Sequence, residues 1–409
     1  MSRRELLRNR GLIGLLARDV VSATGSQMTW IALPWFVLTT TGSAERMAVV
    51  LAVESASLAI FGFLLGNVVT KLGPRRTMLI ADGMRAPLLA VIPVLHWADA
   101  LSFPLLLVLI AVISSVGTAS FASKAALLPD LVGDDETRLT EANALLQAAQ
   151  RITILLGPAL GGVLIAVVGA TNVLLIDAIT FVVAFVLVAT LLRGRWDPEP
   201  HEDRGLAAGI RFILRDRLLR AWSAAIVVSD ACWLGLFAAL PVLVLERYGD
   251  EPEIVGFAWG AWGGGAVLGS AVAFRYVGRF DRLLIVSFGE IGMTAPLWLL
   301  VVDLPPAALA GLMLCSGLAN GIVNAPIHTI IQLRTPRALR QKVWSAVIVG
   351  SAVLGPVVLL IAGPSLERVG LEQTLIGIVL VQSVCAVAFA VAGLQERARL
   401  GPAVPAEAA

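Results

Sequence analysis

Several charged residues lie inside long apolar runs of this 409-residue sequence, where an isolated charge is costly. Burial favours the protonated form of a carboxyl group, so an acid in such a run can take up a proton on one side of a barrier and release it on the other. Glu54 and Asp230 each lie near the middle of a run. We expect Glu54 first and Asp230 second to couple a reaction to protons. For both residues, the alternative is a static buried ion pair or a helix face open to water.

Five further charged residues in these runs have more than one interpretation. Asp82 and Arg85 are three residues apart on one helix face, which predicts a structural ion pair, with proton coupling as the alternative. Arg151 is either the partner of one of the acids, and so a proton-coupling candidate, or a contact for an anionic substrate. Glu290 is another proton-coupling candidate, and Asp177 is a candidate both for proton coupling and for the lining of a substrate cavity.

Polar and aromatic side chains in the same runs could form that cavity. Asn320, Asn324, His328 and Gln332 recur every fourth residue, which places them on one helix face, toward a central cavity or a cytoplasmic gate. Hydrogen bonding between helices explains this stripe equally well, and His328 alone is more typical of a packing residue. The tryptophans favour either an aromatic binding surface or the interfacial belt of a membrane protein. The remaining cavity candidates are Trp30, Trp35, Gln147 and Trp233, with Trp259 and Trp262 as further aromatic members.

The elements that must position these residues are membrane helices. Hydrophobic residues make up 58% of the sequence, the mean hydropathy is +0.86, and only 15% of the residues are charged, against about 25% in a typical soluble domain. Apolar runs of about 20 residues can cross a bilayer, and they must be helical because lipid offers the backbone no partners. We therefore expect an all-α polytopic membrane protein with twelve transmembrane helices. The runs lie near residues 19–40, 47–69, 77–97, 103–124, 146–168, 172–192, 219–245, 254–275, 283–302, 307–331, 342–362 and 373–394.

The basic residues predict the orientation of these helices. Cytoplasmic loops carry an excess of Lys and Arg, and nearly all the basic residues, including Arg18 and Lys124, fall in the N-terminus, the even-numbered connections and the C-terminus. Only Arg46, Arg247 and Arg368 fall on the opposite side. Both ends of the chain are therefore expected in the cytoplasm of the cell, with the protein in the cell membrane.

An internal repeat divides the chain into two halves. The stretch ALPWFVLTTTG recurs as ALPVLVLERYG, and LLGPALGG recurs as VLGPVVLL, each about 200 residues later. Two halves with an even number of helices have the same orientation, which is the parallel arrangement of large secondary carriers. The predicted organisation is an N-terminal six-helix bundle (1–192), a cytoplasmic linker with an amphipathic helix (193–218), a C-terminal six-helix bundle (219–396) and a cytoplasmic tail (397–409).

The stretch GNVVTKLGPRRTML, after the second run, resembles the signature of the major facilitator superfamily. The resemblance covers essentially the whole chain and implies the fold of that family, two pseudo-symmetric six-helix bundles. It implies that Gly66 permits close approach of a neighbouring helix, that Gly73 makes a tight turn, and that Arg75 and Arg76 anchor the turn against lipid phosphates and facing helix ends. Thr70 departs from the family pattern, which has an aspartate there, so the full charge latch between domains is not implied.

The stretch LLGPALGG resembles the fifth-helix motif of the exporter, or antiporter, branch of this superfamily. Gly157 and Gly161 form a small-x-x-x-small face that lets two helix backbones touch. Pro158 bends the helix and frees a carbonyl group, which a neighbouring helix can cover. Gly162 completes the motif, whereas Thr153 stands where the family usually has another glycine. Ordinary helix packing is the alternative interpretation.

Flanking segments such as ALLPDLVGDDETRLTEANALL and NAPIHTIIQLRTP resemble the branch that includes macrolide-efflux and enterobactin-export proteins. This resemblance implies a secondary transporter that exports an amphiphilic small molecule, such as a drug or siderophore, by proton antiport with alternating access. The alternatives are a proton-coupled uptake symporter or facilitator, and a transporter-like sensor or scaffold that transports nothing.

Other classes of function lack the residues that they need. The sequence has no phosphate-binding loop of the G-x-x-x-x-G-K type, no G-x-S-x-G motif and no metal-ligand spacing, so we expect neither an enzyme nor a metal site. We expect no cofactor, with the proton gradient as the source of energy. The expected partners are a small-molecule substrate and the lipid bilayer, with no nucleic acid, and the protein is expected to work as a monomer.

Overall fold

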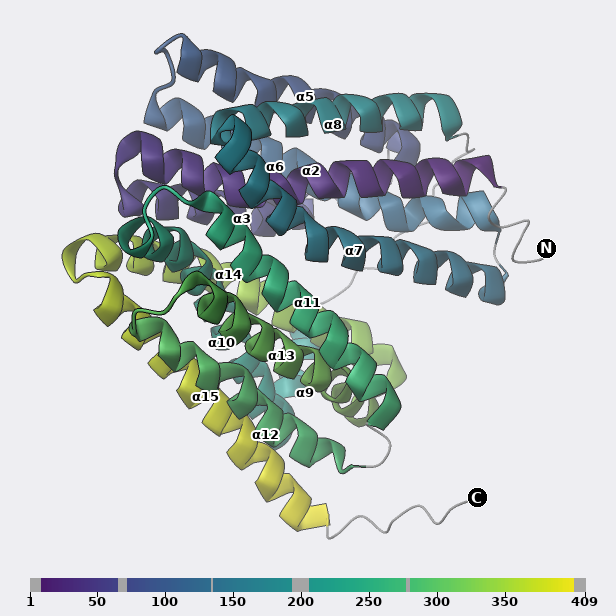
Figure 1. Cartoon of the computed structure of the whole chain (residues 1–409). Coiled ribbons are helices and arrows are strands. Elements are labelled where there is room, and N and C mark those ends of the chain that lie inside the picture. Colours follow the sequence, from purple (N-terminus) through teal and green to yellow (C-terminus); the bar gives the residue numbers. More distant parts are fainter. Residues whose placement is uncertain (1–8, 65–71, 134, 193–205, 277–279, 401–409) are drawn as a thin grey trace. The chain divides into compact units, whose positions relative to one another are not determined.

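The structure is a computed structural model that describes residues 9–64, 72–133, 135–192, 206–276 and 280–400, and the described residues contain helices but no strands (Figure 1). Gly66 and Thr70 lie outside these ranges. Each of the twelve predicted runs falls on a helix, apart from the end of the second run, which lies outside the described residues. The predicted all-α membrane fold is therefore confirmed.

The first half of the chain supplies six long helices. The first of them begins after Asn9, whose side chain accepts hydrogen bonds from the backbone N–H groups of Gly11 and Leu12 and so caps it, and it ends at Gly42, which has a left-handed φ of 63°. The six helices are α2 (Arg10–Thr41), α3 (Ala44–Leu64), α5 (Pro74–Trp97), α6 (Phe103–Val132), α7 (Glu136–Val168) and α8 (Ala170–Leu191).

These helices are longer than the apolar runs that predicted them, and the difference changes two assignments. Arg18 lies inside α2 and Lys124 lies inside α6, whereas the charge pattern placed Arg18 in the cytoplasmic N-terminus and Lys124 in a cytoplasmic connection. A run that is scored by apolarity stops at the first charge, but a helix continues for as long as its backbone hydrogen bonds are satisfied.

The second half begins with a short helix and continues with six long segments. They are α9 (Leu206–Arg215), α10 (Arg217–Arg247), α11 (Pro252–Tyr276), α12 (Arg282–Thr294), α13 (Pro306–Arg334), α14 (Arg340–Arg368) and α15 (Leu371–Leu400). A 3₁₀ helix, η2 (Ala295–Val301), continues α12, and a short one, η3 (Arg337–Leu339), precedes α14. The described residues contain ten segments that are long and apolar enough to cross a membrane; α2, which has Ser26 and Gln27 in its middle, and α3 are not among them.

The chain divides into two compact units, which are described separately below. Unit 1 comprises Met1–His201 with Val244–Gly260, and unit 2 comprises Glu202–Leu243 with Ala261–Ala409. In unit 1, α2 packs against α7 and α8, and α5 packs against α6 and α8. In unit 2, α12 packs against α13 and α15, and α9 packs against α14. The halves predicted from the internal repeat remain a prediction.

Helices α11 and α13 of unit 2 approach each other backbone to backbone. A Cβ atom at Gly265 would lie 2.1 Å from the carbonyl oxygen of Leu314, and one at Gly269 would lie 2.0 Å from that of Leu318. From the other side, a Cβ atom at Gly317 would lie 2.0 Å from the carbonyl oxygen of Trp262. Only glycine permits such contact, which is typical of helix pairs in membranes.

Candidate functional site

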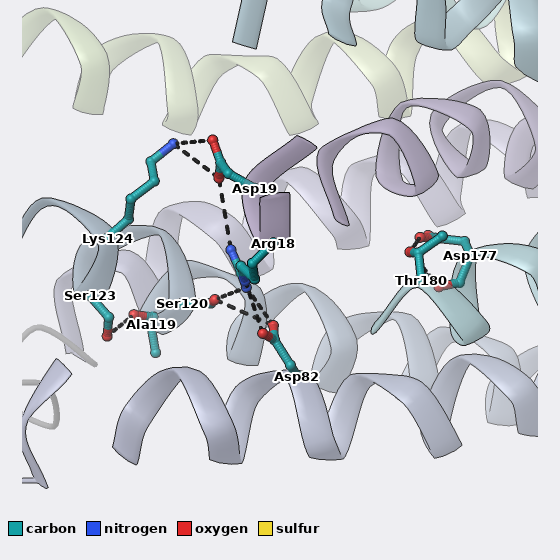
Figure 2. A network of polar contacts seen from close by, with 9 residues as sticks. All are labelled: Arg18, Asp19, Asp82, Ala119, Ser120, Ser123, Lys124, Asp177 and Thr180. Atoms are coloured by element: carbon teal, nitrogen blue, oxygen red, sulfur yellow. Dashed lines mark hydrogen bonds and ion pairs between the residues drawn. The ribbon is translucent and has the colours of Figure 1, made fainter. Parts of the chain in front are cut away.

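A network of buried charges joins α2, α5 and α6 in unit 1 (Figure 2). Arg18 donates two hydrogen bonds to the carboxylate of Asp82, with distances of 3.0 Å from Nε and 2.5 Å from Nη2, and a third to the hydroxyl of Ser120. Asp82 is fully buried and Arg18 is nearly so. The predicted pair between Asp82 and Arg85 is therefore wrong, because the bidentate partner of Asp82 comes from α2.

The same network contains a second ion pair. The ammonium group of Lys124 lies 3.0 Å from the carboxylate of Asp19, and Asp19 lies 3.8 Å from the guanidinium of Arg18 (Figure 2). Two cations and two anions thus neutralise one another inside unit 1. This arrangement favours the structural role of Asp82 over proton coupling. The charge pattern missed Arg18, Asp19 and Lys124, although the Asn9 cap signal, well before the apolar run, indicates that α2 starts early enough to contain Arg18 and Asp19.

Asp177 lies in a second polar cluster, between α8 and α2. It is 1% exposed, and it accepts hydrogen bonds from the hydroxyls of Thr29, at 2.6 Å, and Thr180, at 2.9 Å. A Cβ atom at Gly25 of α2 would lie 2.2 Å from Oδ1 of Asp177, so the glycine makes the space that the carboxylate occupies. Asp177 is therefore a buried, bonded group, and Gly25, Thr29 and Thr180 are its supports, which the sequence did not single out.

Arg85 occupies a pocket of different character. Its guanidinium carbon lies 3.9 Å from the centre of the Phe181 ring, and its buried Nε has no hydrogen-bond partner among the described residues. Asp177, Asp82 and Glu54 are the acids in its electrostatic surroundings. Glu54 is half-buried on α3 and makes no hydrogen bond or ion pair within the described ranges. Glu54 and Asp177 thus both belong to the electrostatic surroundings of Arg85, although the sequence analysis treated the three residues as separate candidates.

The two candidate acids of unit 2, Asp230 and Glu290, have no such cation among the described residues. Asp230 on α10 is exposed and accepts a hydrogen bond of 2.7 Å from the hydroxyl of Ser351 on α14. Glu290 on α12 is 7% exposed, and the described part of the chain gives it no hydrogen-bond or ion-pair partner. Asp230 and Glu290 would repel each other if both were ionised.

The predicted polar stripe of α13 is largely accessible. Asn324, His328 and Gln332 are exposed, whereas Asn320 is half-buried, and its amide contacts the sulfur of Met293 at 3.6 Å. His328 stacks on the ring of Trp344, with centroids 4.2 Å apart. The C-terminal part of the stripe therefore presents polar groups to a surface, and its N-terminal end serves packing between helices.

The aromatic candidates form two pairs of similar geometry. Trp30 and Trp259 lie 5.6 Å apart in unit 1, and Trp233 and Trp262 lie 5.6 Å apart in unit 2, each pair tilted by 56°. Trp35 is 2% exposed in the core of unit 1, so its predicted place in a cavity lining is wrong.

The two remaining candidates for substrate or proton contact lie on α7. Gln147 and Arg151 are exposed, and neither makes a hydrogen bond or ion pair with the described residues. The sequence proposed an acid as one possible partner of Arg151; the structure shows none among these residues.

The glycine and proline motif of α7 is a contact surface. A Cβ atom at Gly157 would lie 2.4 Å from Cβ of Gln27, and one at Gly161 would lie 3.0 Å from Cα of Met28, so both glycines bring α7 against α2. Gly162 faces another way: a Cβ atom there would lie 2.9 Å from Cα of Gly256 on α11. A further close contact comes from Pro158, whose carbonyl oxygen would lie 2.5 Å from a Cβ atom at Gly256. The motif thus packs α7 against two neighbouring segments of unit 1.

The turn before α5 contains Gly73, as the sequence motif predicts, and Arg75 connects this turn to α8. Gly73 has φ 80° and ψ 150°, a conformation that residues with a side chain rarely adopt. Arg75 donates hydrogen bonds to the carbonyl oxygens of Leu192, at 2.6 Å, and Ala189, at 3.0 Å, and so caps the C-terminus of α8 with a positive charge. Arg76 is exposed.

Comparison of the chain with models of known protein families identifies its family. A family model described as Major Facilitator Superfamily matches residues 20–358. The chain belongs to the major facilitator superfamily. This membership places the chain among membrane transporters of small molecules, and the coarse function expected from the sequence is thereby confirmed.

Individual transporters of the superfamily are also similar to this chain. The multidrug efflux pump Tap of Mycobacterium tuberculosis is 29% identical over 91% of each chain, and that of Mycolicibacterium fortuitum is 28% identical over 90% of this chain and 92% of its own. The staphyloferrin A transporter of Staphylococcus aureus is 24% identical over 64% of this chain and 68% of its own. The expected relationship to efflux members of the superfamily is confirmed.

Solved structures agree on the fold. The nucleoside transporter NupG has a TM-score of 0.74 with 11% identity, and the match covers 93% of this chain and 98% of its own. A bacterial homologue of the lysosomal transporter Spinster has a TM-score of 0.69 with 12% identity, covering 96% and 98%. At this identity the likeness concerns the fold alone.

In the described ranges, no group of three or more His, Cys, Asp or Glu could hold a metal ion.

Proposed function

We propose that this superfamily member exports amphiphilic small molecules across the cell membrane in exchange for protons. The observation that carries the proposal is the similarity to multidrug efflux pumps over 91% of both chains. The bundles alternate between two accessible states, both termini lie in the cytoplasm, and the proton gradient is the only source of energy. The working unit is the monomer.

The acids within the long apolar helices support proton coupling. A carrier that exchanges a substrate for a proton needs a carboxyl group that can be neutral in one state and charged in another. Glu54 meets this need in unit 1, because it has no hydrogen bond within the described residues and faces Arg85. Asp230 and Glu290 meet it in unit 2, because neither has a cationic partner in the described residues. Asp82 and Asp177 are less suited, since fixed donors hold both of them.

The closely packed α7 supports export. Its motif resembles that of exporters, and its glycines bring α7 into backbone contact with α2 and with the start of α11. Contacts of this kind hold α7 against these neighbours and let the helix move with them as one body.

The test is transport by purified protein in proteoliposomes. Vesicles that are acidic inside, with the cytoplasmic side of the protein facing out, are given a fluorescent lipophilic dye such as ethidium. Antiport predicts uphill dye uptake and alkalinisation of the lumen, and both should fall to the level of empty vesicles in Glu54→Gln. Glu372→Gln, at an exposed position of α15, removes the same charge and should behave as the wild type. Dye movement together with protons in one direction would instead identify a symporter, and movement without any gradient dependence would identify a facilitator.

A further inference from the structure

The charges near Arg85 in unit 1 have fixed partners, except for Arg85 itself and Glu54. Arg18 and Ser120 bind Asp82, Lys124 binds Asp19, and two threonine hydroxyls bind Asp177. Arg85 makes no hydrogen bond among the described residues, and neither does Glu54. One cation and one acid are thus left without fixed partners in a site where an unpaired buried charge is costly.

The place of Arg85 is defined by an aromatic ring and a glycine. Phe181 on α8 is fully buried, and its ring lies 3.9 Å from the guanidinium carbon. Gly117 on α6 makes room for the guanidinium, because a Cβ atom there would already lie 3.4 Å from that carbon. A guanidinium over an aromatic face gains about 0.5–1 kcal/mol at exposed sites and about 2 kcal/mol or more where water is excluded.

We propose that Phe181 is a positioning residue for the proton-coupling step, and that its ring holds the Arg85 guanidinium while Glu54 is protonated. When Glu54 loses its proton to water, Arg85 leaves the ring and pairs with the new carboxylate. Arg85 remains a cation throughout, and the proton is the only particle released. This inference rests on the proposed proton antiport.

The surroundings explain why Glu54 is the acid that moves Arg85. The charged groups that face Arg85 are Asp177 on α8, Asp82 on α5, Arg18 on α2 and Glu54 on α3, and Arg85 is the charged group that faces Glu54. Asp82 and Asp177 already accept hydrogen bonds from fixed donors, whereas Glu54 accepts none among the described residues. Glu54 is therefore the acid whose attraction for Arg85 depends most directly on whether it carries a proton. The ring of Phe181 and the carboxylate of Glu54 therefore compete for one guanidinium.

The experiment weakens the ring's attraction without changing its shape. Phenylalanine with one, two or three fluorine atoms replaces Phe181, because fluorine withdraws electron density from the ring face. Infrared titration of the purified protein then follows the protonated-carboxyl band that is lost in Glu54→Gln. A weaker ring leaves Arg85 freer to stabilise the Glu54 carboxylate, so the midpoint of this band should move to lower pH with each fluorine, by roughly half a pH unit to one and a half units in total.

Two controls make the result specific. The same fluorinated residues at Phe185, an exposed position one turn further along α8, should leave the midpoint unchanged. Arg85→Gln should move the midpoint to higher pH, and fluorination of Phe181 in that background should have no effect. Arg85→Met, which also removes the charge, serves if the glutamine variant does not fold.

The inference and the proposed function fail in different ways. If the midpoint is the same throughout the Phe181 series, Phe181 does not hold Arg85 against Glu54, and the inference is overturned even where vesicles show proton antiport. If the midpoint shifts as expected but vesicles show no proton-coupled transport, the pairing stands and the proposed antiport is overturned.

Discussion

Gly25 of α2 and Asp177 of α8 share one point of contact: a Cβ atom on the glycine would lie 2.2 Å from the carboxylate oxygen of the aspartate. The hydroxyl of Thr29, one turn further along α2, donates to the other oxygen of the same carboxylate at 2.6 Å. Because Asp177 is 1% exposed, it cannot move to solvent to make space. Any side chain larger than that of glycine at position 25 would therefore overlap with the Asp177 carboxylate.

Gly25→Ala should displace Asp177 and break its hydrogen bond with Thr29. We expect a loss of roughly 1–3 kcal/mol in the free energy of unfolding, the usual cost of overpacking a buried site, and a lower rate of dye export. Thermal unfolding in detergent and transport in vesicles measure the two effects. Gly311→Ala on α13, where a Cβ atom would meet nothing within 4 Å, is the matched control and should not lower the stability. Wild-type stability for Gly25→Ala would show that α8 shifts freely.

Arg18→Met should unfold the protein more readily, because it leaves Asp82 buried without its cation. The expected loss is roughly 3–5 kcal/mol in the free energy of unfolding, measured by denaturant titration. The double variant Arg18→Met with Asp82→Asn should recover most of this loss, since no charge is then left unpaired. Arg76→Gln, at an exposed position, is the control and should be near neutral. A single variant as stable as the wild type would mean that Asp82 takes another partner.

Replacing Pro158 and Gly161 together by alanine should reduce transport more than it reduces the amount of protein in the membrane. Gly161 is tightly packed against Met28, so added atoms separate α7 from α2. Export rate per molecule, with the protein quantified by a fluorescent fusion, measures the effect. Gly377→Ala on α15, where space is open, is the control. Normal turnover in the double variant would reduce the motif to ordinary packing.

Glu290→Met should stabilise the protein while abolishing proton-driven export. Glu290 is nearly buried and lacks a partner in the described residues, so an apolar side chain of similar size should gain roughly 1–3 kcal/mol. Thermal unfolding and lumenal pH in vesicles measure the two opposite effects. Glu372→Met, at an exposed site, should change neither. Export that remains coupled to protons in Glu290→Met would remove this acid from the mechanism.

The sequence predicted the elements well, because both apolar length and the backbone's need for partners in lipid are local properties. Run 103–124 became α6, which continues to Val132, and run 146–168 became part of α7, which begins ten residues earlier, at Glu136. The motifs at Gly73 and Gly161 could also be recognised in the sequence, because a turn with positive φ and close contact with a neighbouring backbone both require glycine.

The pairing of charges could not be predicted in the same way. Asp82 and Arg85 are three residues apart, yet Asp82 binds Arg18, which is 64 positions away on another helix. Spacing identifies residues on one face of a helix, but the rotation of that helix against its neighbours decides which partner they meet. For the same reason, Gly25 and Phe181 gave no signal: their roles depend on what α8 and α5 bring toward them.

The contact between α11 and α13 sets a limit on motion inside unit 2. Four glycine positions, Gly265, Gly269, Gly317 and Gly321, lie directly against main-chain atoms of the facing helix, with no flexible side chain between them to absorb a displacement. Helices α11 and α13 must therefore tilt together as one rigid pair. The exposed amide of Asn324 and imidazole of His328 on α13 move whenever α11 moves. A substrate that touches Asn324 on α13 would therefore also be displaced when α11 moves.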